Sequence, residues 1–224
     1  MLIEVIACSV EDAVAAERGG AGRLELVRAL DKGGLTPPFD FVEEVMRKVT
    51  IPVRVMIRET ADYFAGDAAA VERLAGAAAA AGALGVDGIV VGFLRDSRID
   101  AAAMNAVLNA APSTNATFHH AFDELPDPPA AIERLQAWPQ IDRVLTSAGR
   151  GNWEQKASRV KAWSRAASPV GLLAGGGVDL SAVRVLARSG AREAHVGRAA
   201  RMPPTTEGAV SAQRVAELVE AAGQ

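Results

Sequence analysis

The sequence predicts an α/β fold, a single-domain (β/α)₈ barrel spanning residues 1–224 with eight parallel strands. Three observations support this prediction. Runs of β-forming residues alternate with helical segments eight times along the chain. Division of 224 residues into eight units gives 28 residues each, the length of a strand, a helix and two short loops. No GxGxxG segment, typical of an open doubly wound sheet, follows the first strand.

The eight expected strands are short and lie at similar intervals, at 2–7, 23–27, 53–57, 88–92, 116–119, 143–145, 170–174 and 193–196. In "RGGAGRLELV", "ALGVDGIVVG" and "RSGAREAHVG", a glycine in the left-handed conformation can end the helix before the second, fourth and eighth strands. Proline stops the preceding helix in "TIPVRVMIRE" and "ASPVGLLAGG". The segment "SAQRVAELVEAAG" is expected to form the eighth helix.

Composition argues against several classes of partner. The formal net charge is −3, and with only ten aromatic residues and no dense Lys/Arg block a nucleic-acid surface is not expected. The Ala/Gly-rich region 68–94 is interrupted by charged residues, so no membrane span is expected. One cysteine and an N-terminus without signal-peptide features predict a cytoplasmic protein. Trp138, Trp153 and Trp163 are expected in outer packing or in contact with a second copy.

In such barrels the chemistry lies at the carboxyl ends of the strands. Glu4 and Glu25 stand within the first two strands between apolar residues, so neighbouring strands can bring both carboxylates together inside the barrel. Arg58 ends the third strand and can neutralise one of them. Two alternatives remain open: acid/base catalysis, or a structural Glu–Arg network that fills the barrel floor.

The segment "FHHAFDE" is a second cluster of polar residues. Strand alternation points His119 and His120 to opposite sides, so at most one faces the interior unless the strand has ended. The interior histidine can act as a general acid or base, with Asp123 orienting it or acting itself. Thr146 and Ser147 follow the next strand and are candidate substrate-binding residues.

The triplet Gly175, Gly176 and Gly177 follows the seventh strand. It precedes a helix that Asp179 or Ser181 can cap, and free N–H groups at a helix start favour an anion. The alternative is a tight turn that merely needs glycine. Three more candidates for binding an anionic substrate follow or end the eighth strand, His195, Gly197 and Arg198.

Metal ligation is weakly indicated. Cys8 is a candidate soft ligand, with His119, His120 and His195 as potential companions, but no CxxC or HxxxH spacing is present. A small buried apolar role suits Cys8 better. No metal and no other cofactor is therefore expected.

Several segments together resemble the CutC family, in order "GGAGRLEL", "GGLTP", "IPVRVMIR", "GVDGIVVG", "TFHHAFD", "DRVLTS" and "AGGGV". The resemblance runs from the first strand to the last and implies a cytoplasmic barrel of a family named for copper homeostasis. Family members thought to bind Cu(I) have cysteines where this chain has Ile6 and Val27. His120 stands where the family usually has arginine.

Two functions follow as hypotheses. The first is an enzyme or binder for a small anionic or carbonyl-bearing metabolite at the barrel mouth, with isomerase, lyase and hydrolase chemistry all compatible. The alternative is Cu(I) binding without catalysis, as the family name suggests. Cu(I) selects thiolate and thioether ligands, so Cys8, even helped by Met56, makes a poor site.

Overall fold

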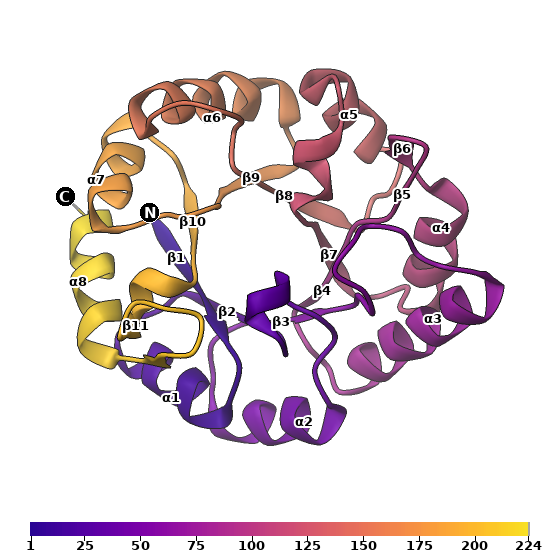
Figure 1. Cartoon of the computed structure of the whole chain (residues 1–224), viewed down its shortest axis with the longest axis horizontal. Coiled ribbons are helices and arrows are strands. Elements are labelled where there is room, and N and C mark those ends of the chain that lie inside the picture. Colours follow the sequence, from indigo (N-terminus) through magenta and orange to yellow (C-terminus); the bar gives the residue numbers. More distant parts are fainter. Residues whose placement is uncertain (224) are drawn as a thin grey trace.

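The eight expected strands close into a barrel. A computed structural model describes residues 1–223, and its eight barrel strands are all parallel (Figure 1). Neighbouring strands follow the chain around the barrel, and β1 pairs with β10 to close it. The predicted fold class is confirmed, and strand ends differ from prediction by at most two residues. The barrel strands are β1 (Leu2–Ala7), β2 (Arg23–Leu26), β3 (Val53–Met56), β4 (Gly88–Val91), β7 (Asn115–Phe118), β8 (Ile141–Thr146), β9 (Gly171–Ala174) and β10 (Glu193–Val196).

Helices form the outer ring (Figure 1). Several begin at a residue whose side chain accepts a backbone N–H of the first turn, such as Ser9, Asp67, Asp100 and Asp179. The helices are α1 (Val10–Arg18), α2 (Phe39–Lys48), α3 (Ala68–Ala83), α4 (Ala101–Ala110), α5 (Pro128–Leu135), α6 (Trp153–Ala167), α7 (Leu180–Ser189) and α8 (Ala212–Gly223). None of those within the described residues is long and apolar enough to cross a membrane.

The glycines that were expected to precede three strands do take left-handed conformations. Gly20, Gly85 and Gly190 have φ of 88°, 72° and 86°. Only glycine adopts such angles without strain, so each can turn the chain from a helix towards the next strand. This prediction is confirmed.

The apolar core lies between the sheet and the helices. Outward-facing strand residues such as Val5, Leu24 and Val55 are fully buried there and belong to one large cluster with the helices. Inward-facing residues alternate with them, as the period of a strand requires. Among these, Ile6, Val27, Met56 and Val90 form a separate small apolar cluster inside the barrel.

Below that cluster, the barrel floor is a network of charged side chains. Arg54 donates to Asp142 at 2.6 Å and to Asp87 at 3.0 Å. Glu193 accepts from Arg143 at 2.8 Å and from Arg23 at 2.5 Å. Charges buried in this way are tolerated because each has a partner. The structural Glu–Arg network considered for the floor therefore exists, and it extends well beyond the two glutamates.

Short segments surround the opposite, open end of the barrel. The turn η1 (Leu30–Lys32) follows β2, η2 (His120–Glu124) follows β7, and η3 (Arg198–Ala200) follows β10. Two small hairpins complete the rim, β5 (Leu94–Arg95) with β6 (Arg98–Ile99), and β11 (Arg201–Met202) with β12 (Ala209–Val210). Since β-to-α connections meet at this end, the candidate site residues converge there.

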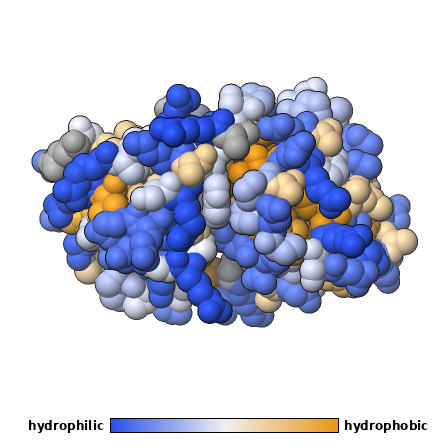
Figure 2. All heavy atoms as spheres, turned by 90° about the horizontal axis from the view of Figure 1, so that it is seen from above, coloured by the Kyte–Doolittle hydropathy of each residue, from blue (hydrophilic) through white to orange (hydrophobic). Residues whose placement is uncertain are grey.

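The outer surface seen in Figure 2 is mainly hydrophilic, with small separated hydrophobic areas. Trp138, Trp153 and Trp163 are partly buried and pack against the large core cluster, as the outer-packing expectation predicted. Phe64 and Met202 are the exposed large hydrophobic residues of the described chain.

Candidate active site

A cavity of about 920 Å³ opens at the carboxyl ends of the barrel strands. Its size suits a small-molecule ligand. Most of the predicted site residues line it, namely Glu25, Arg58, His119, His120, Asp123, Ser147, Gly176, Gly177, His195, Gly197 and Arg198. Glu4, Thr146 and Gly175 are not among the residues that line it.

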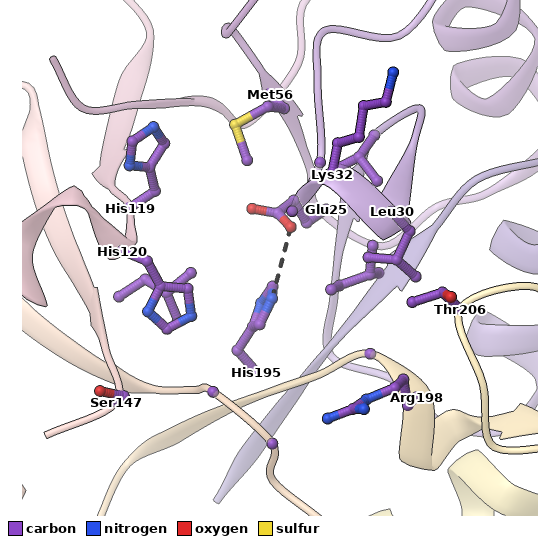
Figure 3. A pocket seen from close by; sticks show the side chains of 18 of the residues that line it. Glu25, Leu30, Lys32, Met56, His119, His120, Ser147, His195, Arg198 and Thr206 are labelled. Atoms are coloured by element: carbon purple, nitrogen blue, oxygen red, sulfur yellow. Dashed lines mark ion pairs between the residues drawn. The ribbon is translucent and has the colours of Figure 1, made fainter. Parts of the chain in front are cut away.

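Glu4, Glu25 and His195 meet at the inner end of the cavity. In the strand register, His195 of β10 is the partner of Glu4 on β1. His195 Nδ1 lies 2.7 Å from Glu4 Oε1, and His195 Nε2 lies 3.6 Å from Glu25 Oε2. Figure 3 shows the imidazole of His195 directed at the Glu25 carboxyl. The two carboxylates therefore do come together, with a histidine between them.

Arg23 sets the charge of the inner carboxylate. It is 2% exposed and its Nε donates to Glu4. Burial alone would raise the pKa of Glu4, but Arg23 and His195 hold it at about 2. Glu4 therefore stays ionised near neutral pH. When His195 Nδ1 carries a proton, this N–H donates a hydrogen bond to the Glu4 carboxylate. Arg58 was considered for neutralising one of the two glutamates. Among the described residues it forms no ion pair with either, although its positive charge acts to lower the pKa of Glu25.

Glu25 has the opposite behaviour, since no arginine pairs with it among the described residues. Burial raises the pKa of Glu25 to about 7, although the neighbouring His195 acts to lower it. Burial lowers the pKa of His195, but Glu25 and Glu4 outweigh this and raise it above its usual value. The Glu25 carboxyl, at the cavity, therefore gains or loses a proton near neutral pH.

Arg58 instead holds together two loops of the rim. Its Nε donates to the Thr60 carbonyl at 2.9 Å and its Nη1 to the Gly33 carbonyl at 3.3 Å. It also donates to the Ala61 carbonyl and lies 4.8 Å from the Tyr63 ring centroid. No carboxylate of the described chain pairs with Arg58, so its positive charge remains in the cavity wall.

The two consecutive histidines both line the cavity, because β7 ends at Phe118 and the strand alternation stops there. Asp123 pairs with His120, whose Nδ1 lies 2.8 Å away, and not with His119. Thr146 Oγ1 donates to Asp123 at 2.6 Å, and the Ser147 amide donates at 2.9 Å. Thr146 and Ser147 therefore hold Asp123 in place, and Asp123 orients His120.

The glycine triplet has both a structural and an exposed part. A Cβ at Gly175 would lie 2.5 Å from Leu145 Cδ1, and one at Gly176 would lie 2.9 Å from Ser147 Cβ. Gly176 and Gly177 have φ of 81° and 86°. A Cβ at Gly177 would meet nothing within 4 Å. Close packing explains Gly175 and Gly176, and the turn requires glycine at Gly176 and Gly177, both of which line the cavity.

The start of the helix after the triplet is capped by Asp179, whose side chain accepts from the Ala182 amide at 2.8 Å. The Asp179 cap places a carboxylate beside the glycine triplet. Its negative charge would repel an anion bound at the start of that helix. Arg198 and Lys32 line the same cavity and bring positive charge to its rim.

Cys8 lies outside the cavity lining and packs against the apolar cluster of Ile6, Val27 and Met56. Arg201 Nη2 is 3.5 Å from its sulfur, and burial raises the pKa of its thiol. The apolar role suggested for Cys8 agrees with this packing.

A metal ion would find its best donors elsewhere. Among the described residues, Glu4, Glu25 and His195 can place one ligand atom each within 4.8 Å of one another. These oxygen and nitrogen donors do not suit a soft ion such as Cu(I). Moreover, Arg23 and His195 already occupy the Glu4 carboxylate. The arrangement fits proton transfer better than metal ligation.

Arg23 was not predicted as a site residue because it begins its strand, whereas the chemistry of such barrels lies at the carboxyl ends of strands. The signal was present in "RLEL": residues two apart in a strand face the same side, so Arg23 and Glu25 both point into the barrel. His195 was expected to bind an anionic substrate from the end of the last strand; the register places it between the two glutamates.

Comparisons with known proteins agree with the resemblance of the sequence. The model of the CutC family matches residues 1–200. A family protein CutC of Xanthomonas axonopodis pv. citri is 39% identical over 198 residues, covering 87% of this chain and 82% of that protein. The mouse copper homeostasis protein cutC homolog is 38% identical over 197 residues, covering 87% and 72%.

Solved structures give the same result. The CutC structure from Streptococcus agalactiae superimposes with a TM-score of 0.79 at 27% identity, covering 88% of this chain and 98% of that one. Thiamine phosphate pyrophosphorylase from Pyrococcus furiosus has a TM-score of 0.62 at 13% identity, covering 99% and 95%, and shares the fold alone. The chain belongs to the CutC family.

Proposed function

We propose that this chain is an enzyme that transfers a proton on a small anionic or carbonyl-bearing metabolite bound at the barrel mouth. The observation that carries the proposal is the Glu25 carboxyl, which faces the cavity and whose pKa burial raises to about 7. A carboxyl group with this pKa can both take and give a proton near neutral pH. Structural carboxylates that are simply paired with arginine, as Glu4 is, lack this property.

Glu4 and His195 support that role. The bond between Glu4 and His195 Nδ1 fixes the ring, so that Nε2 is directed at Glu25. A protonated His195 stabilises the Glu25 carboxylate, and Glu4 stabilises the protonated His195. These three residues form a hydrogen-bonded and ionic chain that ends at the cavity.

The rim supplies groups that suit an anionic end of the metabolite. Arg198, Lys32 and Arg58 bring three positive charges to the cavity wall. Among the described residues, none of the three has a carboxylate partner at salt-bridge distance. A ligand carboxylate or phosphate can therefore pair with Arg198 or Lys32 without displacing an existing ion pair.

The test is a screen with a bacterial metabolite extract, followed by mass spectrometry. We expect wild-type protein to deplete at least one metabolite, and Glu25→Gln to do so at least a hundredfold more slowly. Glu43→Gln is the matched control, since Glu43 is 55% exposed on α2. Equal depletion by wild type and Glu25→Gln, or no depletion by wild type, would reject the proposal.

Copper binding is the second candidate, because mouse and human relatives are named copper homeostasis protein cutC homologs. The residues here do not favour it. Ile6 and Val27, which replace cysteines of the family pattern, form an apolar cluster with Met56, and the thiol of Cys8 has a raised pKa. In a competition titration with a Cu(I) chelator, we expect wild type to bind Cu(I) no more tightly than Cys8→Ser. Tight binding that depends on Cys8 would favour the copper function.

A further inference from the structure

His119 is a buried titratable residue whose contacts leave one ring atom unused. It is 2% exposed, yet it lines the same cavity as Glu25. Its Nδ1 accepts a hydrogen bond from the Ala121 amide at 3.2 Å. Its Nε2 has no hydrogen-bond partner among the described residues. Burying a polar atom without a partner is energetically unfavourable, so its presence calls for a physical reason.

The contacts of the ring determine which nitrogen carries the proton. Because Nδ1 accepts a hydrogen bond, it has no proton in the neutral ring, and the proton is on Nε2. Burial and the positive charge of Arg58 hold the pKa of His119 well below its usual value. His119 is therefore a neutral imidazole with an unused N–H donor at neutral pH.

The ring is also held rigidly. The Tyr63 ring lies 5.2 Å from it and the Phe118 ring 6.2 Å, centroid to centroid. On another side, the backbone of Gly92 approaches so closely that a Cβ there would lie 2.5 Å from Nδ1. A donor fixed in this way pays no reorganisation cost when a ligand arrives.

Figure 3 shows the His119 ring on one side of the pocket and the Glu25 carboxyl with His195 across from it. Resting on the function proposed above, we propose that His119 is a catalytic residue that donates its Nε2 hydrogen to a carbonyl oxygen of the substrate. The substrate is then a carbonyl compound, and Glu25 removes a proton from the carbon next to that carbonyl. Neutral imidazoles polarise substrate carbonyls in other proton-transfer enzymes.

The electrons balance without a co-reactant. The Glu25 carboxylate takes the proton, and the electron pair of the broken C–H bond forms a C=C bond with the carbonyl carbon. The π electrons of the carbonyl move to its oxygen, which becomes an enolate oxygen and accepts from His119 Nε2. Return of the proton from Glu25 to carbon restores the carbonyl. A neutral donor suits this step because it stabilises the enolate without protonating it as strongly as an imidazolium would.

The test repeats the metabolite-extract incubation in D₂O. A proton removed by Glu25 exchanges with solvent, so a carbonyl-bearing metabolite should gain deuterium at carbon when wild-type protein is present. His119→Leu removes the donor and should reduce the rate of labelling about 10²–10³-fold. His119→Gln places an amide N–H near the position of Nε2 and should restore part of this rate. Glu43→Gln, on the exposed surface, should label like wild type.

A second measurement checks the histidine itself. Two-dimensional ¹H–¹⁵N NMR of the imidazole rings should show His119 as the neutral Nε2–H form from pH 6 to 8, and circular dichroism should show that each variant is folded. A protonated His119 in this range, or a folded His119→Leu variant that labels at the wild-type rate, would overturn the proposal.

The outcomes separate the two proposals. If wild type depletes a metabolite but no carbon gains deuterium, or if His119→Leu acts like wild type, the inference about His119 fails and the proposed enzyme remains. If wild type changes no metabolite in either solvent, the proposed function itself fails.

Discussion

Replacing Glu25 by glutamine should make the protein more stable at high pH. In the folded protein the pKa of Glu25 is about 7, against 4.5 for an ordinary glutamate. A carboxyl whose pKa is raised by folding contributes stability below its unfolded pKa, and this contribution is lost as pH rises through the folded pKa. Over the whole interval the loss is about 3 kcal/mol, because each unit of pKa shift corresponds to about 1.4 kcal/mol. Most of this loss falls between pH 5 and pH 8.5.

Glutamine keeps the neutral, hydrogen-bonding character of the protonated acid and cannot ionise. The difference in the free energy of unfolding between Glu25→Gln and wild type should therefore move in favour of the variant by about 2–3 kcal/mol from pH 5 to pH 8.5. Guanidinium unfolding, followed by circular dichroism at several pH values, measures it. Glu43→Gln, at a site 55% exposed, is the control and should show a flat difference. A difference for Glu25→Gln that varies by less than about 0.5 kcal/mol would refute the reasoning.

Three further predictions concern the floor, the His119 contact and the pH dependence of activity. Arg23→Met should lower the free energy of unfolding by about 3–5 kcal/mol, because it removes the arginine partner of the buried Glu4 and leaves only His195 beside it. Arg47→Met, in an exposed pair, should change the free energy of unfolding by less than about 1 kcal/mol. Gly92→Ala should lower the free energy of unfolding by about 1–3 kcal/mol and shift the His119 NMR signals, because the added Cβ would overlap the His119 ring. Gly76→Ala, whose Cβ would meet open space, should not destabilise the protein. Chemical denaturation compares the two variants. For the metabolite found in the screen, kcat/KM should rise with pH and reach half its maximum near pH 7, as Glu25 loses its proton; a profile flat from pH 5 to 9 would argue against Glu25 as the base.

The barrel could be predicted because its signals are local. Each strand-and-helix unit carries its own turn residues, such as Gly20, Gly85 and Gly190, and the eight units repeat at a regular interval. The mouth could be predicted for the same reason, since the direction of each strand determines which end of it carries the connecting loop. The proximity of Glu4 and Glu25 followed from their places on adjacent strands.

The partners within the site could not be predicted in this way, because they depend on the register of strands far apart in the chain. His195 reaches Glu4 only through the pairing of the last strand with the first. Asp123 pairs with His120 rather than His119 because β7 ends one residue earlier than expected and the 3₁₀ turn η2 begins. The charged floor joins Arg54 to Asp142, residues from strands that are not neighbours in the sheet.

The central claim is that a proton is gained and lost at Glu25, facing the cavity, near neutral pH. The most direct measurement is the ¹³C NMR titration of its side-chain carboxyl carbon, assigned by comparison with Glu25→Gln. The expected midpoint lies near pH 7, because burial raises the pKa of Glu25 from the usual 4.5. A midpoint near 4.5 would mean that Glu25 is an ordinary carboxylate, and the proposed acid/base chemistry at this barrel mouth would be contradicted.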